Sequence, residues 1–318
     1  ADGTVSLFRN CLIPLKRTRG ERSYEARLAG MDDVDVQLVR PADVPYLVES
    51  GRALAGITGL DLVREHRGSG SSDVQEVLTD LDFGSADLVV GVPVSWLDVS
   101  SIDDLDDVAQ EVRHKHGRAL RVATKFSNLT RDYLREHGLV DFRLVESLGA
   151  TEGAPRAGQA DVIVDLTSTG TTLETNGLKQ IVGGRVLRSQ ACLVASGRAV
   201  DWDEARLTAL GRLVMLFEAT ITAHRERTVT ARFAPPGPSA EVRATFAAKM
   251  VDYTWSELSD LQELVGRAEI SQIPTLLSDL AAAGSLLVAV DDPSLVVTTT
   301  SAFGRFRAQL QHQPPRRR

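Results

Sequence analysis

One segment of the sequence combines residue types that could hold an anion. In "DVIVDLTSTGTTLETNGL", residues 161–178, a short apolar run is followed by small, hydroxyl-bearing residues and then by a helical pattern. This order predicts a strand, a loop and a helix, and the backbone N–H groups at the start of such a helix attract anions. Gly170 would let the loop backbone turn and approach a bound group closely. The hydroxyl donors of the loop are Thr167, Ser168, Thr169, Thr171 and Thr172. The segment is therefore a candidate phosphate site.

Asp165 lies at the predicted carboxyl end of the strand, where open α/β sheets bind their ligands. A carboxylate repels a phosphate, so Asp165 is better suited to two ribose hydroxyls, a metal ion or a developing cation. The loop contains no lysine, so it is not a phosphate loop of the Walker type. Ser and Thr also commonly cap helices, and a glycine turn needs no ligand. This segment alone leaves both interpretations open.

Other positions have side chains that could contact a nucleotide or a sugar. The turn "GITGLD" (56–61) follows a predicted strand and contains Gly59 and Asp61, Glu152 lies in the tight turn "GATEGAP" (149–155), and Arg40 ends a strand. Each also has a structural explanation, as an ordinary strand-to-helix turn, a solvated loop acid or a solvated strand end. No Ser-His-Asp order stands out, so catalysis by a nucleophilic side chain is not indicated.

Patterns typical of strands and helices alternate through the first two thirds of the chain. Strands are predicted at 35–39, 54–59, 86–93, 120–125, 142–147, 160–166 and 184–196, and helices at 4–12, 41–51, 100–117, 128–138 and 202–228. This alternation predicts α/β layering with mainly parallel sheets. From about residue 228 onward we expect a separate α+β unit, since a strand (227–233), a turn (234–239), a helix (239–250) and a helix-then-strand segment (269–290) follow.

Length and composition limit the class of protein. The chain has 318 residues, which is too many for one ordinary core and suits about two or three. A net charge of −7 without a long basic block argues against nucleic acid as a partner. Two cysteines without metal-type spacing argue against a disulfide framework or a structural zinc site, and they fit a reducing compartment. The apolar runs are too short to span a bilayer, so no membrane partner is expected.

Taken in order, these segments resemble the ATP phosphoribosyltransferase family, the first enzyme of histidine biosynthesis. The resemblance extends from about residue 4 to about residue 215 and is strongest at its last segment, where a Glu is followed by G-x-A-D and then by D-x-x-S-T-G-x-T-L. With this match, phosphate binding by the loop is favoured over helix capping. The matching segments are "RPADVPYLVESGRALAGITGLDLV" (40–63), "LDFGSADLVVGVP" (81–93), "RVATKFSNLTRDYL" (121–134) and "ESLGATEGAPRAGQADVIVDLTSTGTTLETNGL" (146–178).

The resemblance implies a displacement at C1 of phosphoribosyl pyrophosphate, in which N1 of ATP attacks and diphosphate leaves. Residues 167–172 would hold the 5-phosphate of the sugar. Asp165 would face the ribose hydroxyls and Glu152 would lie near the ribose or the diphosphate, so both are candidate catalytic residues. Mg²⁺ would be held mainly by the diphosphate of the substrate. The implied contacts to ATP are Gly59, Asp61 and Arg40.

The resemblance also implies an architecture of two α/β lobes around a cleft, like that of periplasmic binding proteins, with the second lobe inserted in the first. A small C-terminal α+β domain would follow. Residues 1–93 with 184–228 would form the first lobe, 94–183 the second lobe with the phosphate loop, and 229–318 a regulatory-like extension.

The C-terminal segment "ISQIPTLLSDLAAAGSLLVAV" resembles part of the histidine-binding domain of the family, so L-histidine is a candidate inhibitor. Members of the family assemble as dimers or hexamers, which predicts a homo-oligomer here. The expected location is the cytoplasm, or the plastid if the source is a photosynthetic eukaryote.

The family normally opens with a strand and a P-x-K-G-R-type turn that contacts phosphates. This chain begins where that segment should end, which predicts a truncated start. The same observation leaves open a non-catalytic small-molecule-binding regulatory subunit, or a truncated paralogue of the same fold. A third possibility is a phosphoribosyltransferase that acts on another base.

Overall fold

The computed structural model describes residues 2–18, 24–68, 70–147, 150–258, 260–298 and 302–311. The chain forms two compact units. One unit is Ala1–Val36 with Ala205–Arg305, and the other is Gln37–Glu204 with Phe306–Arg318. The three-part division predicted from the sequence stays a prediction. Over the described residues, no helix combines the length and apolar composition that a bilayer span requires.

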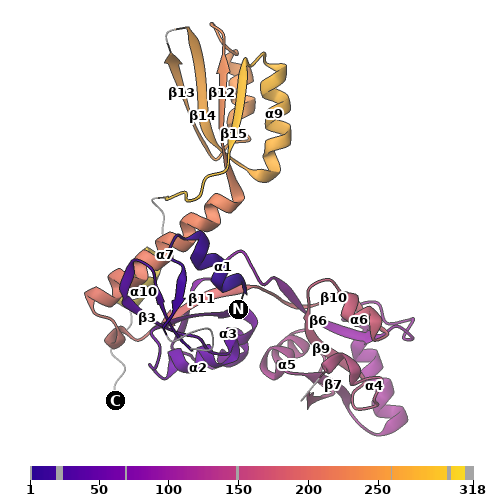
Figure 1. Ribbon diagram of the computed structural model, residues 1–318. Helices are drawn as coiled ribbons and strands as arrows, with labels where there is room; N and C mark the ends of the chain where they lie inside the picture. Colours follow the sequence, from indigo (N-terminus) through magenta and orange to yellow (C-terminus); the bar gives the residue numbers. More distant parts are fainter. Residues whose placement is uncertain are drawn as a thin grey trace. The chain divides into compact units, whose positions relative to one another are not determined.

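The second unit contains a three-stranded sheet with β11 in the middle, and we call the part built on this sheet the first lobe (Figure 1). Helix α2 and strand β4 are joined through a short turn, α2 itself follows the turn η1, and α3 follows β4 without a loop. Buried apolar side chains from these elements, among them Val48, Val63 and Val194, form one core. The bounds are η1 (Pro41–Asp43), α2 (Val44–Glu49), β4 (Ala55–Gly59), α3 (Leu60–Arg67), β5 (Val74–Leu78) and β11 (Ala191–Ser196).

The same unit contains a five-stranded sheet in the order β10-β6-β9-β7-β8, which is the basis of the second lobe. Side chains alternate along β9, so Val162 and Val164 face a core with α4 and α5, while Ile163 faces the opposite core with α6. The bounds are β6 (Ala86–Pro93), α4 (Asp104–His116), β7 (Leu120–Thr124), α5 (Ser127–Glu136), β8 (Phe142–Glu146), η2 (Thr151–Gly153), β9 (Val162–Thr167), α6 (Thr171–Thr175) and β10 (Leu178–Ser189).

Local sequence explains the limits of α4 and the turn that leads into α5. The Asp104 carboxylate accepts hydrogen bonds from the backbone N–H groups of Ser100 and Ser101, both at 2.8 Å, at the start of α4. The helix ends at Gly117, whose φ of 64° is the left-handed conformation that glycine adopts most easily. At the start of α5, the Thr124 hydroxyl accepts a hydrogen bond from the N–H of Phe126 at 2.9 Å.

The second lobe is inserted in the first, because the chain leaves the three-stranded sheet after β5 and returns to it at β11. Strand β11 then pairs with both β4 and β5. The predicted fold class, two α/β lobes with the second inserted in the first and a small C-terminal α+β domain, is confirmed.

The prediction of mainly parallel sheets is wrong for the described strands. Only β7 runs parallel to its neighbours β8 and β9, whereas β6 is antiparallel to both β9 and β10, and β11 is antiparallel to both of its partners. The reason is topological, since the chain enters the second lobe along β6 and leaves it along β10. An alternation of strand and helix patterns enforces parallel pairing only where a helix crosses directly between neighbouring strands, as α5 does between β7 and β8.

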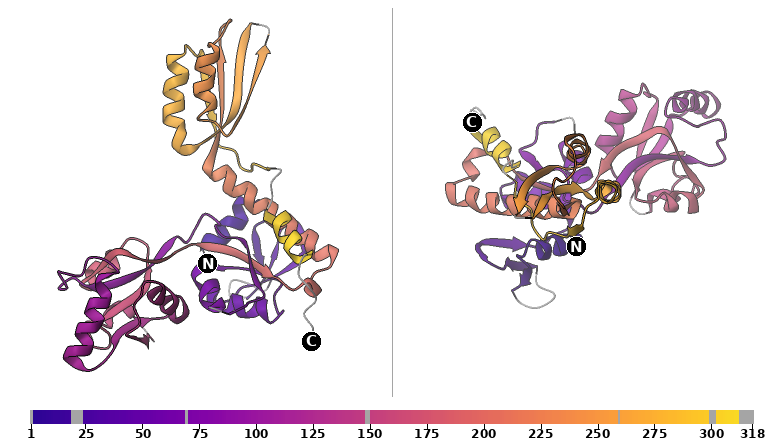
Figure 2. Two further views of the ribbon diagram at one scale, coloured as in Figure 1. Left: turned by 180° about the vertical axis from the view of Figure 1, so that it is seen from behind. Right: turned by 90° about the horizontal axis from the view of Figure 1, so that it is seen from above.

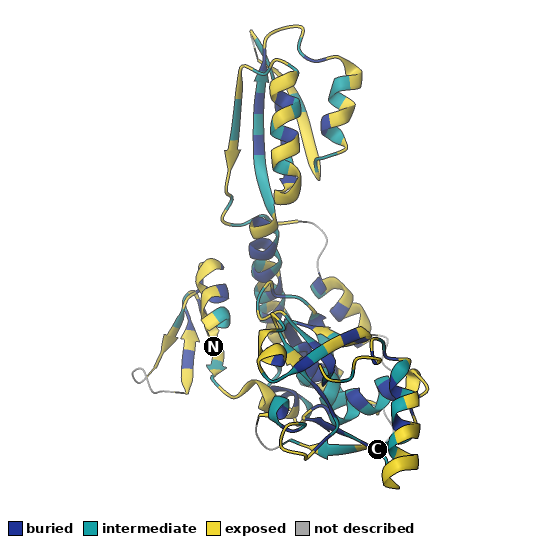
Figure 3. Ribbon diagram, turned by 90° about the vertical axis from the view of Figure 1, so that its right-hand side faces the viewer, coloured by how far each residue is buried: buried dark blue, intermediate teal, exposed yellow. Residues whose placement is uncertain are grey.

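The first unit combines the N-terminal segment with a long helix and a C-terminal sheet. The sheet order β13-β14-β12-β15 is antiparallel throughout, and α8 and α9 cover one face of it (Figures 1 and 2). Buried residues run along much of α7 (Figure 3). The bounds are α1 (Asp2–Asn10), β1 (Leu15–Arg17), β2 (Glu25–Leu28), β3 (Met31–Gln37), η3 (Ala199–Asp201), α7 (Glu204–Arg225), β12 (Glu226–Phe233), α8 (Ala240–Ala247), β13 (Asp252–Leu258), β14 (Leu261–Glu269), η4 (Ile270–Gln272), α9 (Ile273–Ala282), β15 (Leu287–Asp291) and α10 (Ala302–Gln311). Of these, η3, the last residue of β3 and the first residue of α7 belong to the second unit, and α10 spans the boundary between the units.

Several predicted elements have different limits in the structure. The strand predicted at 184–196 is two strands, β10 and β11, separated at Gln190. The helix predicted at 202–228 ends at Arg225, and β12 begins at the next residue. The sequence patterns did not indicate β1, β2, β5, β13 or β14. The predicted helix at 239–250 and the predicted helix-then-strand segment at 269–290 are confirmed as α8, α9 and β15.

Candidate functional site

The predicted phosphate loop joins β9 to α6 through a left-handed glycine. Gly170 has a φ of 79° and is the N-cap residue of α6, where no side-chain capping hydrogen bond forms. The Thr167 hydroxyl accepts a hydrogen bond from the N–H of Gly170 at 2.9 Å, which stabilises the turn itself. In this loop, whose residues are all described, the hydroxyls therefore do not cap the helix. The N–H groups of its first turn are therefore available to an acceptor from outside the helix.

The hydroxyl side chains of the loop are accessible. Thr169 donates a hydrogen bond to the Thr171 hydroxyl at 3.1 Å, which holds these two side chains together across the turn. A Cβ added at Gly170 would meet no atom within 4 Å, so the backbone conformation, and not crowding, explains the glycine. The exposed members of the loop are Ser168, Thr169, Thr171 and Thr172.

Asp165 lies on the same face of the sheet as this loop. Its strand β9 alternates, so Asp165 shares a face with Ile163, which packs in one cluster with Ala154 and Leu173. Leu173 belongs to α6, and Ala154 directly follows η2, the turn that contains Glu152. The side chain of Asp165 is half-buried and accepts a hydrogen bond from the N–H of Leu166 at 2.9 Å. The structure thus brings Asp165, the Glu152 turn and the phosphate loop together on one face.

The residues predicted to contact ATP lie together in the first lobe. The Thr58 hydroxyl donates a hydrogen bond to the carbonyl of Pro41 at 2.7 Å, and this bond connects the neighbours of Gly59 and Arg40. Gly59 is the last residue of β4 and the N-cap of α3. Arg40 is the exposed N-cap residue of η1.

Asp61 is held in place by a residue that the sequence patterns did not single out. It is 6% exposed, and its carboxylate Oδ1 accepts a hydrogen bond from the Ser189 hydroxyl at 2.5 Å. That hydroxyl also accepts a hydrogen bond from the N–H of Asp61 at 3.0 Å. A Cβ at Gly59 would lie 2.4 Å from Oδ1 of Asp61, so this arrangement requires glycine there. Ser189 is the last residue of β10, and no local sequence pattern singles it out. The ligand roles predicted for all these residues stay predictions.

The thiol of Cys192 is buried in the core of the first lobe. Burial raises the pKa of Cys192 to about 12, and the nearby carboxylates of Glu76 and Asp61 add to the shift. The thiol is therefore protonated and is not a nucleophile at neutral pH.

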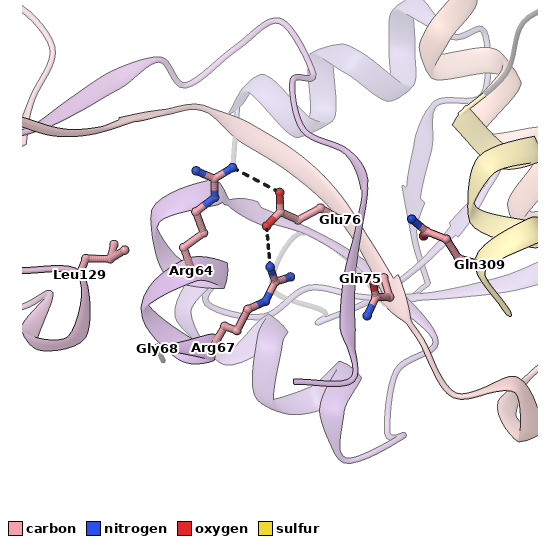
Figure 4. Close-up of a pocket in the computed structure, with 7 residues that line it drawn as sticks. All are labelled: Arg64, Arg67, Gly68, Gln75, Glu76, Leu129 and Gln309. Atoms are coloured by element: carbon pink, nitrogen blue, oxygen red, sulfur yellow. Dashed lines mark ion pairs between the residues drawn. The ribbon is translucent and has the colours of Figure 1, made fainter. Parts of the chain in front are cut away.

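A polar cavity of about 490 Å³ adjoins the C-terminal half of α3, away from its Gly59 end (Figure 4). Arg64 and Arg67 both point to Glu76 of β5, with N–O distances of 3.5 Å and 3.4 Å. The carboxylate of Glu76 therefore already compensates part of the positive charge that the two arginines bring to the cavity. Its lining residues are Arg64, Arg67, Gly68, Gln75, Glu76, Leu129 and Gln309.

The described parts of the chain contain no group of three or more His, Cys, Asp or Glu side chains that could hold a metal ion. Asp165 and Glu152 are carboxylates close in the fold to the phosphate loop, since both lie on its face of β9. They could supply single oxygen ligands to a cation that arrives with other ligands of its own.

Comparison with known proteins gives consistent matches. A family model described as ATP phosphoribosyltransferase matches residues 40–215. The ATP phosphoribosyltransferase of Chelativorans sp. (strain BNC1) is 47% identical over 209 residues, which is 65% of this chain and 90% of that protein. The ATP phosphoribosyltransferase of Bradyrhizobium diazoefficiens is 44% identical over 234 residues, covering 73% of this chain and 71% of that protein.

Among solved structures, the chain resembles one in the ATP phosphoribosyl transferase (HisG:HisZ) complex from Thermotoga maritima. The TM-score is 0.51 with 24% sequence identity, and the match covers 68% of this chain and 92% of that chain. This likeness shows a shared fold.

Proposed function

The chain belongs to the ATP phosphoribosyltransferase family, and from this premise we propose which of its residues carry out each part of the reaction. The reaction is the first step of histidine biosynthesis, in which N1 of ATP is joined to C1 of phosphoribosyl pyrophosphate and diphosphate is released. The observation that carries our assignment is the common face of β9, where Asp165, the Glu152 turn and the uncapped start of α6 meet.

The phosphate loop binds the 5-phosphate of phosphoribosyl pyrophosphate. Its donors are the N–H groups at the start of α6 and the exposed hydroxyls of Ser168, Thr169, Thr171 and Thr172. Holding the phosphate fixes one end of the sugar, so the ring presents C1 in a constant direction. Positioning of this kind lowers the activation free energy, because the reactants have already lost translational and rotational entropy when they bind.

Asp165 faces the ribose and stabilises the positive charge that develops on the sugar during the reaction. As the bond from C1 to the diphosphate lengthens, positive charge develops on the sugar, and a nearby carboxylate stabilises it. Asp165 is suited to this role because its hydrogen bond to the N–H of Leu166 fixes one oxygen. Glu152 lies on the neighbouring turn and interacts with the ribose hydroxyls or the diphosphate side of the substrate.

A divalent cation is required by the family, and we assign it as Mg²⁺ held mainly by the diphosphate of the substrate. When bound there it would neutralise the charge that the leaving diphosphate acquires. Residues that fit this arrangement are single carboxylates near the diphosphate, and Asp165 and Glu152 meet that condition. Their part is to orient the metal-bound substrate, and no cage of protein ligands is needed.

ATP binds to the first lobe at the start of α3. The proposed contacts are Gly59, Asp61 and Arg40, whose neighbours are connected by the bond from Thr58 to Pro41. Arg40 is exposed and can reach a phosphate, whereas Asp61 can offer its second carboxylate oxygen to a hydroxyl or amino group. The adenine ring supplies the nucleophile, which agrees with the absence of any Ser-His-Asp order in the sequence.

The test is to mix the protein with ATP, phosphoribosyl pyrophosphate and Mg²⁺ and to follow the ultraviolet absorbance of phosphoribosyl-ATP. Formation of product that depends on all three components is expected. Binding of both substrates without turnover would favour a non-catalytic regulatory subunit instead. Turnover only with a base other than adenine would indicate a different phosphoribosyltransferase.

We further propose a homo-oligomer and an effector site in the C-terminal domain. The Thermotoga maritima protein is part of a complex, so assembly with further chains is a property to examine here. L-histidine is the candidate inhibitor, on the resemblance of residues 270–290 to a histidine-binding domain. If saturating histidine changes neither the activity nor the melting temperature, this part of the proposal is wrong. A reducing, cytoplasmic location suits the two buried free thiols, Cys11 and Cys192.

A further inference from the structure

Helix α5 of the second lobe is capped by a side chain from the first lobe. The Glu65 carboxylate, on α3, accepts hydrogen bonds from the N–H of Asn128 at 2.9 Å and from the N–H of Leu129 at 3.0 Å. In return, the Asn128 side-chain amide donates to the backbone carbonyl of Glu65 at 3.0 Å. We call these hydrogen bonds the Glu65 contact.

The start of α5 needs an acceptor that its own sequence does not supply. Its N-cap residue is Phe126, and no capping side chain from the helix's own flank bonds to it. The Thr124 hydroxyl accepts hydrogen bonds from the N–H of Phe126, the residue before the helix, and from the Thr130 hydroxyl. The first-turn N–H groups would otherwise lack a partner, so a carboxylate from the other lobe compensates both the orphan donors and the positive end of the helix.

The two helices also pack against each other around this contact. Leu62, one turn before Glu65 on α3, packs on the core of the second lobe, as does Leu129. A Cβ added at Gly68 would lie 3.1 Å from the amide nitrogen of Asn128, so the end of α3 approaches α5 closely. Leu129 is seen beside the C-terminal half of α3 in Figure 4. Glu65 therefore lies within a packed junction between the lobes.

The elements that meet at this junction lead directly to both halves of the proposed site. Helix α3 begins at Leu60, between Gly59 and Asp61, and Asp61 lies one turn before Glu65. Helix α5 follows β7, and β7 pairs with β9, so Thr124 lies opposite Val164, the neighbour of Asp165. A change in the distance between α3 and α5 would thus change the distance between the ATP contacts and the ribose contacts.

We propose that Glu65 is a positioning residue that sets the separation of the two lobes and so aligns ATP with C1 of phosphoribosyl pyrophosphate. This role rests on the function proposed above. Glu65 does not touch the reacting atoms. It acts through α5, because a charged acceptor on backbone N–H groups holds the lobes more firmly than a neutral one. Closure of two lobes around substrates is a common way to complete a catalytic arrangement.

Spin labels on the two lobes can test this role without any turnover. Exposed positions suited to labelling are Arg52→Cys in the first lobe and His116→Cys in the second. The native thiols, Cys11 and Cys192, are buried. The distance distribution between the labels is measured in the otherwise unchanged chain and with Glu65→Ala, Glu65→Gln or Glu136→Ala. Glu136 is an exposed acid at the other end of α5 and is the matched control.

We expect Glu65→Ala to broaden and lengthen the distance distribution and to lower kcat/KM for both substrates by roughly tenfold to a hundredfold. Glu65→Gln should act in the same direction but less strongly, since its carbonyl oxygen still accepts one hydrogen bond. Glu136→Ala should change neither quantity. If Glu65→Ala does not fold, as judged by circular dichroism, Glu65→Gln carries the test because it keeps the volume of the side chain.

An unchanged distance distribution in both Glu65 variants would overturn the proposal, whether or not activity falls. A longer distance with unchanged kcat/KM would also overturn it, because the lobe separation would then not matter for alignment. If the unmodified chain forms no phosphoribosyl-ATP, the proposed function fails, and the distance measurement still decides whether Glu65 holds the lobes together.

Discussion

The Ser189 hydroxyl donates a 2.5 Å hydrogen bond to the carboxylate of Asp61, and it accepts a 3.0 Å hydrogen bond from the N–H of the same residue. One serine at the end of β10 therefore fixes both the side chain and the backbone of the first turn of α3. This leaves the second oxygen of Asp61 as the one that a nucleotide could use. The arrangement separates the structural role of Asp61 from its proposed role in binding.

Replacing Ser189 should affect stability and ATP binding together. Ser189→Ala leaves a buried carboxylate without its donor, so we expect the free energy of unfolding to fall by about 2 kcal/mol. The KM for ATP should rise while the KM for phosphoribosyl pyrophosphate stays constant. Ser196→Ala is the matched control, because Ser196 also donates a 2.5 Å hydrogen bond to a carboxylate, that of Asp201. Equal effects of both variants on the KM for ATP would argue against Asp61 as a nucleotide contact.

The left-handed turn at Gly170 gives a second test, with a control of nearly identical geometry. Gly170 and Gly138 have φ angles of 79° and 82°, and an added Cβ would meet no atom within 4 Å at either position. Each change to alanine should therefore cost about 1 kcal/mol of stability from backbone strain alone. Only Gly170→Ala should raise the KM for phosphoribosyl pyrophosphate, because only that backbone shapes the phosphate loop. A similar rise with Gly138→Ala would mean that the effect is global.

The arrangement of the proposed phosphate loop could be predicted from the sequence because its residues are contiguous. A strand, an acid, a hydroxyl-rich loop and a glycine within residues 161–178 already define which side chains lie near one another. Alternation along β9 then places Asp165 on the side of Ile163, and the structure covers that side with α6 and the turn of Glu152. In this segment the order of the residues along the chain is enough to predict which side chains lie near one another in the structure.

The Ser189 contact of Asp61 and the Glu65 contact could not be predicted in the same way. Ser189 is distant in sequence from Asp61, and Glu65 is distant from Asn128, so no pattern within a window links either pair. The direction of pairing was also missed, because β6 and β10 are the strands by which the chain enters and leaves the second lobe. Such contacts depend on how the lobes assemble, which periodicity does not encode.

Asp161 gives a prediction for stability at acid pH. Burial alone would raise the pKa of Asp161, but hydrogen bonds from Arg118 and Arg121 outweigh it and hold the pKa well below its usual range. The carboxylate accepts from Arg118 at 2.6 Å and 2.9 Å and from the N–H of Arg121 at 2.8 Å. The unfolded chain therefore binds a proton more readily than the folded chain, so this stabilisation is present above pH about 4 and is lost as the pH falls further.

Asp161→Asn should accordingly lower the free energy of unfolding at pH 7 by about 3 kcal/mol, since two guanidinium groups lose their partner. The difference from the unmodified chain should narrow as the pH is lowered below about 4. Denaturant unfolding at pH 7 and at several acid values measures both effects. Parallel stability profiles over the whole range would contradict the role of this ion pair.

Asp165→Asn separates catalysis from folding at the central carboxylate. The substitution keeps the shape of the side chain and an acceptor for the N–H of Leu166, so the free energy of unfolding should change by less than about 1 kcal/mol. The negative charge that stabilises the developing cation is lost, and turnover should fall by about 100-fold. Phosphoribosyl-ATP formation and thermal unfolding are measured on the same preparation. Asp107→Asn, at an exposed position of α4, should change neither. Losses of turnover and stability in equal proportion would make Asp165 a structural residue, because a carboxylate that acts only on the transition state leaves the ground-state fold unaffected.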